Sequence, residues 1–231
     1  MSEEKKEKEK SAEPTEELKE TGSANLENSR DSHRIKLLTI VGEIEGHEAV
    51  SGNTKATKYE HLLPLLAEVE DSNEIDGLLI LLNTLGGDVE AGLSIAEMIA
   101  SLSKPSVSLV LGGSHSIGVP LAVAADHSFI VKSATMMIHP VRSSGTFIGV
   151  IQSYRNIEKI QDRITTFISD HCKMKKERVE ELMLHIGQQV KDVGMILSGE
   201  EAVKEGLIDE MGGIKEATDR LIEIINQSEN K

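Results

Sequence analysis

The sequence predicts an α/β fold with mainly parallel strands. Short apolar runs that suit strands alternate with stretches of helical spacing through most of the chain. One run, GLLILL at residues 77–82, contains no polar side chain. Such a run is typical of a strand covered on both faces of a sheet. Alternation of strands with helices favours a parallel sheet, because each helix returns the chain to the same edge.

The first half of the chain gives two strands and two helices. The β-branched run at residues 35–44 predicts a strand, and leucines at helical spacing predict a helix over 55–69. Pro64 lies inside that helix and is expected to end or kink it. The strand at 77–82 then leads into a helix over 88–102.

The second half continues the alternation and adds a long helix. Its predicted elements are a strand at 106–111, a helix at 116–125, short strands at 129–131 and 135–139, helices at 152–172 and 175–187, and a last helix at 215–226. Ser198 begins a capped helix with acidic residues in its first turn. The helix from Gln152 is longer than a compact sheet can cover, which indicates a subunit contact; an intrachain helix hairpin fits the pattern nearly as well.

Residues 1–34 differ in composition from the rest. They are almost wholly Glu, Lys, Ser, Asn and Thr, which bury too little apolar area to offset the entropy lost on ordering. We therefore expect a disordered, charged tail over 1–34 and one folded domain over 35–231. The tail is interpreted as a solubilising leader rather than as a docking arm.

Composition excludes several classes of function. Hydrophobic residues make up 39% of the 231, so a sizeable core is available, but aromatic residues make up only 2%. The formal net charge of −14 opposes contact with nucleic acid or anionic lipid. No apolar stretch reaches the roughly 20 residues that span a bilayer. The single cysteine, Cys172, excludes an internal disulfide and opposes a zinc site, so we expect a cytoplasmic protein without a metal.

Two glycine-rich turns follow predicted strands. In the first, Gly86 and Gly87 join the apolar strand to a helix, where a backbone without side chains can approach a ligand closely. In the second, GGSHSIG at 112–118, Ser116 falls near a helix start. Taken alone, such a serine is more often a helix cap than a nucleophile. His115 is poorly placed as its base, since adjacent helical side chains diverge by roughly 100°.

A histidine ends the strand at 135–139. Pro140 keeps His139 extended and directs it to the rim of the sheet, where open α/β sheets bind ligands.

Together these segments resemble the Clp protease proteolytic subunit family. The matching stretches are Asn83-Thr84-Leu85-Gly86-Gly87, Gly112 to Gly118, Met137-Ile138-His139-Pro140, and LSGEEAVKEGLIDEMGG at 197–213. The resemblance covers about Ile35 to Ile225 and is strongest to the translocation-enhancing branch of the family.

The resemblance implies a serine endopeptidase with a ClpP/crotonase-like fold, repeated β-β-α units and a long protruding handle helix. It makes Ser116 the nucleophile, His139 the general base, and the N–H groups of Gly87 and Ile117 the oxyanion-hole donors, with Gly86 and Gly113 binding substrate. It also implies polypeptide substrates, no cofactor, a heptameric ring that can stack through the handle, and a link to protein export. The chain has no nucleotide-binding P-loop, so ATP would be used by an unfoldase partner.

The sequence departs from the family at the third catalytic position. That position aligns with Val190, and the nearest carboxylate is Asp192, which we carry as the orienting residue of His139; a surface loop role fits it as well. Because of this departure, an alternative is that the chain forms a catalytically inactive ring that acts as a binding or adaptor protein. An acyl-CoA enzyme on the same fold would not need the serine and histidine. A Ser–Lys dyad would need Lys104 or Lys132, both of which are expected to be solvated.

Overall fold

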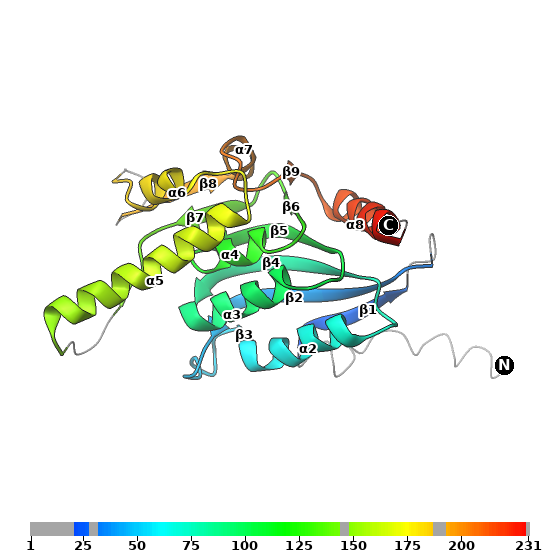
Figure 1. The fold of residues 1–231 in the computed structure, drawn as a ribbon, viewed down its shortest axis with the longest axis horizontal. Helices are drawn as coiled ribbons and strands as arrows, with labels where there is room; N and C mark the ends of the chain where they lie inside the picture. Colours follow the sequence, from blue (N-terminus) through cyan, green and yellow to red (C-terminus); the bar gives the residue numbers. More distant parts are fainter. Residues whose placement is uncertain (1–20, 28–31, 144–147, 187–192, 230–231) are drawn as a thin grey trace, which may run out of the picture.

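The chain folds around one mixed sheet with helices on both faces (Figure 1). A computed structural model describes residues 21–27, 32–143, 148–186 and 193–229. The strands are β1 (Ser23–Glu27), β2 (Arg34–Glu45), β3 (Ala56–Lys58), β4 (Gly77–Gly87), β5 (Ser106–His115), β6 (His127–Ile130), β7 (Thr135–Ile138), β8 (Met195–Ser198) and β9 (Glu210–Met211). The helices are α2 (Tyr59–Asp71), α3 (Val89–Ala100), α4 (Gly118–Val123), α5 (Val150–Asp170), α6 (Lys176–Met183), α7 (Gly199–Lys204) and α8 (Ile214–Glu229).

The sheet has the order β1-β2-β4-β5-β6-β9, and every neighbouring pair in it is parallel except β1 with β2. The parallel arrangement confirms the fold class that the alternating pattern predicts. The predicted strand at 77–82 is the amino-terminal half of β4, in which Leu78, Leu79, Ile80 and Leu82 are completely buried. A strand apolar at every position is needed here because both faces of β4 are covered.

Two apolar layers sandwich the sheet. One face packs against α2 to α7 and contains Leu38, Ile80 and Leu82. The other face contains Ile35, Leu79 and Val107, which lie beneath Leu221, Ile225 and the rest of α8. In β2, β4 and β5, the residues under α8 belong to the amino-terminal halves of the strands.

Part of the predicted tail is ordered. Ser23–Glu27 pairs with β2 as the antiparallel edge strand β1, so the boundary at Ile35 is wrong for these residues. Leu26 packs against the smaller apolar layer and Ser23 is fully buried. Composition cannot reveal this pairing, because the stabilising partner is β2. The remaining tail residues outside 21–27 and 32–34 are not among the described ones.

Helix α2 runs through Pro64 instead of ending there. The proline is exposed and removes only one backbone hydrogen bond, while Leu62, Leu65 and Leu66 hold the opposite side of the helix in the core.

Strand β5 is longer than predicted, and the helix after it is shorter. β5 pairs with β6 through Val107–Val110 and then with β7 through Gly113–His115. This second pairing draws the glycine-rich turn into the sheet, so α4 begins only at Gly118. The switch of partners places Ser116 where β4, β5 and β7 all end.

The long helix α5 projects beyond the sheet, as Figure 1 shows. Only Ile164, Thr165, Phe167 and Ile168 of α5 are buried, all in its last two turns. Within the described residues, no helix combines the length and apolar character needed to cross a membrane.

Candidate active site

The end of β4 approaches Ser116 so closely that only glycine fits. Gly86 has φ +94°, and a Cβ added to it would lie 2.8 Å from the Cβ of Ser116 and 2.8 Å from the carbonyl oxygen of His115. Gly87 has φ +153°, and its added Cβ would lie 2.2 Å from the Ile44 carbonyl oxygen. The glycine pair therefore allows a close approach to other parts of the chain, whereas the sequence analysis expected a close approach to a ligand.

Ser116 has a left-handed backbone, with φ +56°. Its N–H donates to the Met137 carbonyl at 2.8 Å, and its carbonyl accepts from the Val119 N–H at 3.0 Å. A left-handed residue other than glycine costs energy and persists only where surrounding contacts hold it. The serine thus occupies a strained turn between β5 and α4.

The helix-cap interpretation of Ser116 is wrong. The N-cap of α4 is Ile117, which makes no side-chain capping bond. The nearby Ser114 is fully buried and donates its Oγ–H to the Gly118 carbonyl at 2.6 Å. Among the described residues, no backbone carbonyl accepts the N–H of Ile117, which is therefore available beside Ser116.

His139 follows β7, and its ring is fixed by a backbone bond. Its Nδ1 lies 2.7 Å from the Pro140 carbonyl oxygen. A carbonyl can only accept, so Nδ1 carries the proton and Nε2 of the neutral ring is left as an acceptor. Gly194 packs directly on this residue, since a Cβ added to it would lie 2.8 Å from the His139 Cβ.

These residues meet in one cavity of about 410 Å³. Its wall includes Gly87, Ser116, Ile117 and His139, which come from three separate parts of the chain. No hydrogen bond joins the Ser116 hydroxyl to His139 within the described residues. Such bonds are often long without substrate and tighten when it binds.

Two predicted residues lie outside this wall. Gly86 packs behind Ser116, as described above, and the Gly113 N–H donates to Asn83 Oδ1 at 3.2 Å. Both glycines therefore shape the turns that carry the site. Asp192 and Val190 lie outside the described residues.

His115 is turned toward a different partner. Its Nε2 lies 2.9 Å from Thr135 Oγ1, and it is absent from the cavity wall. Burial lowers the pKa of His115 below its ordinary value, and the nearby His139 lowers the pKa further. This agrees with the expectation that His115 is not the base of Ser116.

The geometry opposes a Ser–Lys dyad. Lys104 Nζ donates to the carbonyls of Ser72 and Ile75, and Lys132 Nζ lies 3.5 Å from Glu200. Neither lysine lines the cavity.

Sequence reasoning missed most of the cavity wall. The missed residues are Glu43, Leu85, Val89, Val119, Val141, Arg142, Ile164, Ile168 and Met183. The α5 and α6 members belong to apolar stripes, which predict burial but not the surface they face. Glu43 follows a β-bulge between Gly42 and Glu43, and no motif in the sequence marks it.

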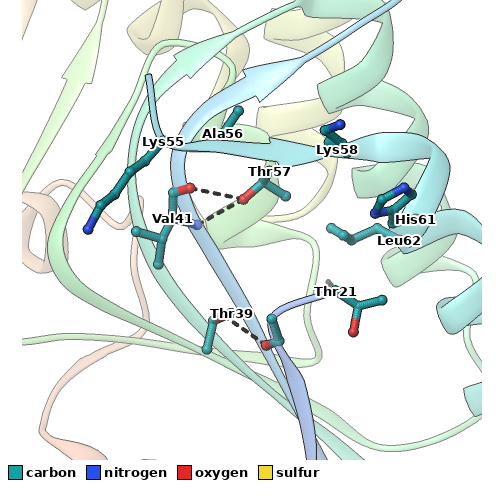
Figure 2. A pocket seen from close by; sticks show the side chains of 10 residues that line it. Thr21, Thr39, Val41, Lys55, Ala56, Thr57, Lys58, His61 and Leu62 are labelled. Atoms are coloured by element: carbon teal, nitrogen blue, oxygen red, sulfur yellow. Dashed lines mark hydrogen bonds between the residues drawn. The ribbon is translucent and has the colours of Figure 1, made fainter. Parts of the chain in front are cut away.

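A larger cavity of about 640 Å³ lies beside β2, β3 and α2, and its described wall contains no serine (Figure 2). Its Thr57 hydroxyl accepts from the Val41 N–H at 3.0 Å and lies 3.1 Å from the Val41 carbonyl oxygen. That hydroxyl therefore completes a backbone ladder and is not a free nucleophile. Lys58, also in this wall, lies 3.7 Å from Glu45.

Fold and site together define a member of the Clp protease family. The family model described as Clp protease matches residues 36–215, so the chain belongs to that family, a family of serine peptidases. The ClpP/crotonase-like fold is thereby confirmed. Members of the family form oligomeric rings and work with ATPases.

Within the family, the chain is 49% identical to the translocation-enhancing protein TepA of Halalkalibacterium halodurans, over 93% of this chain and 83% of that protein. It is 27% identical to the ATP-dependent Clp protease proteolytic subunit 1 of Chlamydia trachomatis, over 61% of this chain and 72% of that subunit. The structure of a point mutant of ClpP1 from Listeria monocytogenes superimposes with a TM-score of 0.60 at 24% identity, over 78% of this chain and 93% of that one. This last likeness concerns the fold alone.

Proposed function

We propose that this chain is a serine endopeptidase that cleaves peptide bonds in polypeptides. The observation that carries the proposal is the convergence of Ser116, His139 and the Gly87 and Ile117 backbones in one cavity. Ser116 Oγ attacks the peptide carbonyl while His139 Nε2 takes its proton and then gives that proton to the leaving amine. Water then attacks the acyl group on Ser116. His139 Nε2 takes a proton from this water and gives it to Ser116 Oγ as the acyl group leaves.

The backbone N–H groups of Gly87 and Ile117 are proposed to bind the oxyanion that forms during attack. Gly87 and Ile117 both line the cavity that contains Ser116. One such donor is typically worth ~10²–10³ in rate, because it is already oriented toward the developing charge.

The Nδ1 proton of His139 has a hydrogen-bond acceptor even without a carboxylate. The Pro140 carbonyl fixes the proton on Nδ1, which is the tautomer that a general base at Nε2 requires. This weakens the case for an inactive adaptor ring, which rested on the missing family carboxylate. Asp192 remains the candidate carboxylate from the sequence.

A fluorophosphonate probe, together with hydrolysis of a peptide substrate, tests the proposal. We expect the wild-type chain to be labelled and active, and Ser116→Ala to be neither. His139→Gln should lose at least about 10³-fold in kcat. Ser94→Ala is the matched control, because Ser94 is an exposed residue of α3 outside both cavity walls. A folded, assembled wild type that the probe does not label would refute the proposal.

We also propose that the chain forms a heptameric ring, as its resemblance to the Clp protease proteolytic subunit family implies, and that rings stack through α5. An apolar cluster lies at the start of this helix: Ile148, Val150, Ile151 and Tyr154 are 64–92% exposed. Ile151→Glu should reduce stacked rings to single rings in mass photometry, whereas Lys159→Glu, farther along α5, should not. Unchanged stacking in Ile151→Glu would refute this contact.

The proposed setting is the cytoplasm, with an ATP-driven unfoldase as partner and a link to protein export. Family membership and likeness to the translocation-enhancing relative support this setting.

A further inference from the structure

The candidate site continues into a second hollow. This cavity, of about 380 Å³, lies between the start of α3 and the exposed part of α5. Its wall contains Asp88, Glu90, Ser143, Ser153, Asn156, Ile157 and Ile160, and it shares Gly87, Val89, Val141 and Arg142 with the first cavity. We call the two together the groove. A polypeptide cut at Ser116 would contact both parts of it.

Carboxylates outnumber cations along the described wall of the groove. Glu43, Asp88 and Glu90 line it, whereas Arg142 is its single Lys or Arg side chain. Arg142 already interacts with another group of the protein. The same sign of charge prevails over the whole chain, which has 39 acidic and 25 basic side chains.

The three carboxylates differ in how far they are already engaged. Glu90 accepts two bonds from Arg163, at 2.7 and 3.0 Å, and Asp88 Oδ1 accepts from the Ala91 N–H at 2.8 Å. Glu43 is exposed, and within the part of the chain that the structure describes no hydrogen bond or ion pair holds its carboxylate. Glu43 is therefore the charge most available to a bound chain.

From this arrangement we infer that the groove selects cationic polypeptides, in which Lys or Arg lies close to the cleaved bond. The inference rests on the proposed function, and it names the substrate class of that same site. Glu43 is the specificity-determining residue: it pairs in register with Gly86 of β4, and it lines the same cavity as Ser116 and the apolar side chains of Ile164, Ile168 and Met183. An ion pair at an exposed carboxylate of this kind contributes about a two- to fivefold effect.

Three peptides that differ only beside the cleaved bond test the inference. They carry Lys, Ala or Glu at the flanking positions around the same apolar residue. We expect kcat/KM for wild type to fall in the order Lys, Ala, Glu, by about two- to fivefold at each step at low salt. The spread should narrow at 1 M salt, where the screening length is only ~3 Å.

Substitution of Glu43 isolates its contribution. Glu43→Gln should lower the ratio of kcat/KM for the Lys peptide over the Ala peptide by about two- to fivefold, and Glu43→Lys should favour the Glu peptide. Glu48→Gln is the control, since Glu48 is an exposed glutamate outside the groove. Equal kcat/KM for the three peptides, or an unchanged ratio in Glu43→Gln, would overturn the inference.

Binding separates this inference from the proposed function. The affinity of Ser116→Ala for the same three peptides, measured by fluorescence anisotropy, does not depend on catalysis. Binding in the order Lys, Ala, Glu supports the charge selection even if no peptide is cleaved, in which case only the proposed function fails. Equal binding together with cleavage rejects the selection and leaves the peptidase intact.

Discussion

Because Ser116 has a left-handed backbone, two substitutions that both abolish activity should differ in their effect on stability. Neither alanine nor glycine at this position can act as a nucleophile, so both variants should be inactive. They differ in backbone freedom: alanine at φ +56° costs about 1–2 kcal/mol, and glycine avoids this cost. Glycine gives back about 0.4–1 kcal/mol through the greater entropy of its unfolded chain. We therefore expect Ser116→Gly to be more stable than Ser116→Ala by about 1 kcal/mol.

Ser94 provides a control in which the sign reverses. It is an exposed residue inside α3, where glycine is less favourable than alanine by about 0.8–1.0 kcal/mol. Ser94→Gly should therefore be less stable than Ser94→Ala, and both should keep peptidase activity.

Thermal unfolding of the four variants at one protein concentration measures this difference. A change of 1 kcal/mol corresponds to about 2–4 °C in Tm for a chain of this size. Fixed concentration matters because assembly also stabilises the folded chain. If Ser116→Gly is less stable than Ser116→Ala, as at Ser94, the strained turn does not hold in solution and the reasoning is refuted.

Three further predictions concern other parts of the molecule. Because the Pro140 carbonyl already fixes the Nδ1 proton of His139, Asp192→Asn should reduce kcat by less than about tenfold; a loss near the ~10⁴ seen when a triad aspartate is removed would assign the orienting role to Asp192. Burial lowers the pKa of His115, so the unfolded chain binds its proton more readily. The free energy of unfolding should fall as pH decreases below about 6.5, less steeply in His115→Gln, and identical pH profiles would contradict this. Ser198→Ala breaks the capping box with Glu201 and should lower the free energy of unfolding in urea by about 1 kcal/mol. The same substitution at an exposed serine that caps no helix should leave the free energy of unfolding unchanged.

Local patterns in the sequence were sufficient for the central elements. The run at 77–82 predicts a buried strand because no side chain in it favours water, and β4 is buried along that run. The capped helix after Ser198 was equally clear, since a capping box depends on two residues three positions apart. Prediction failed where a distant partner decides: β1 is ordered by β2, and the extension of β5 is ordered by β7.

The sequence also identified the chemical groups of the candidate site. The resemblance to the motifs of the Clp protease family singles out Ser116, His139 and the glycine pair, and all but Gly86 line the same cavity. Their roles in catalysis remain proposals that the Ser116 and His139 variants test.

The sequence by itself determined the alternating α/β order and the buried centre of the sheet, because each depends on neighbours along the chain. Only the tertiary structure decided the left-handed turn of Ser116, the Nδ1 bond of His139 to Pro140, and the meeting of Glu43 with the α5 and α6 side chains around the cavity. These features depend on strand register and on packing between segments that are distant in sequence, and a periodicity within one segment contains no information about either.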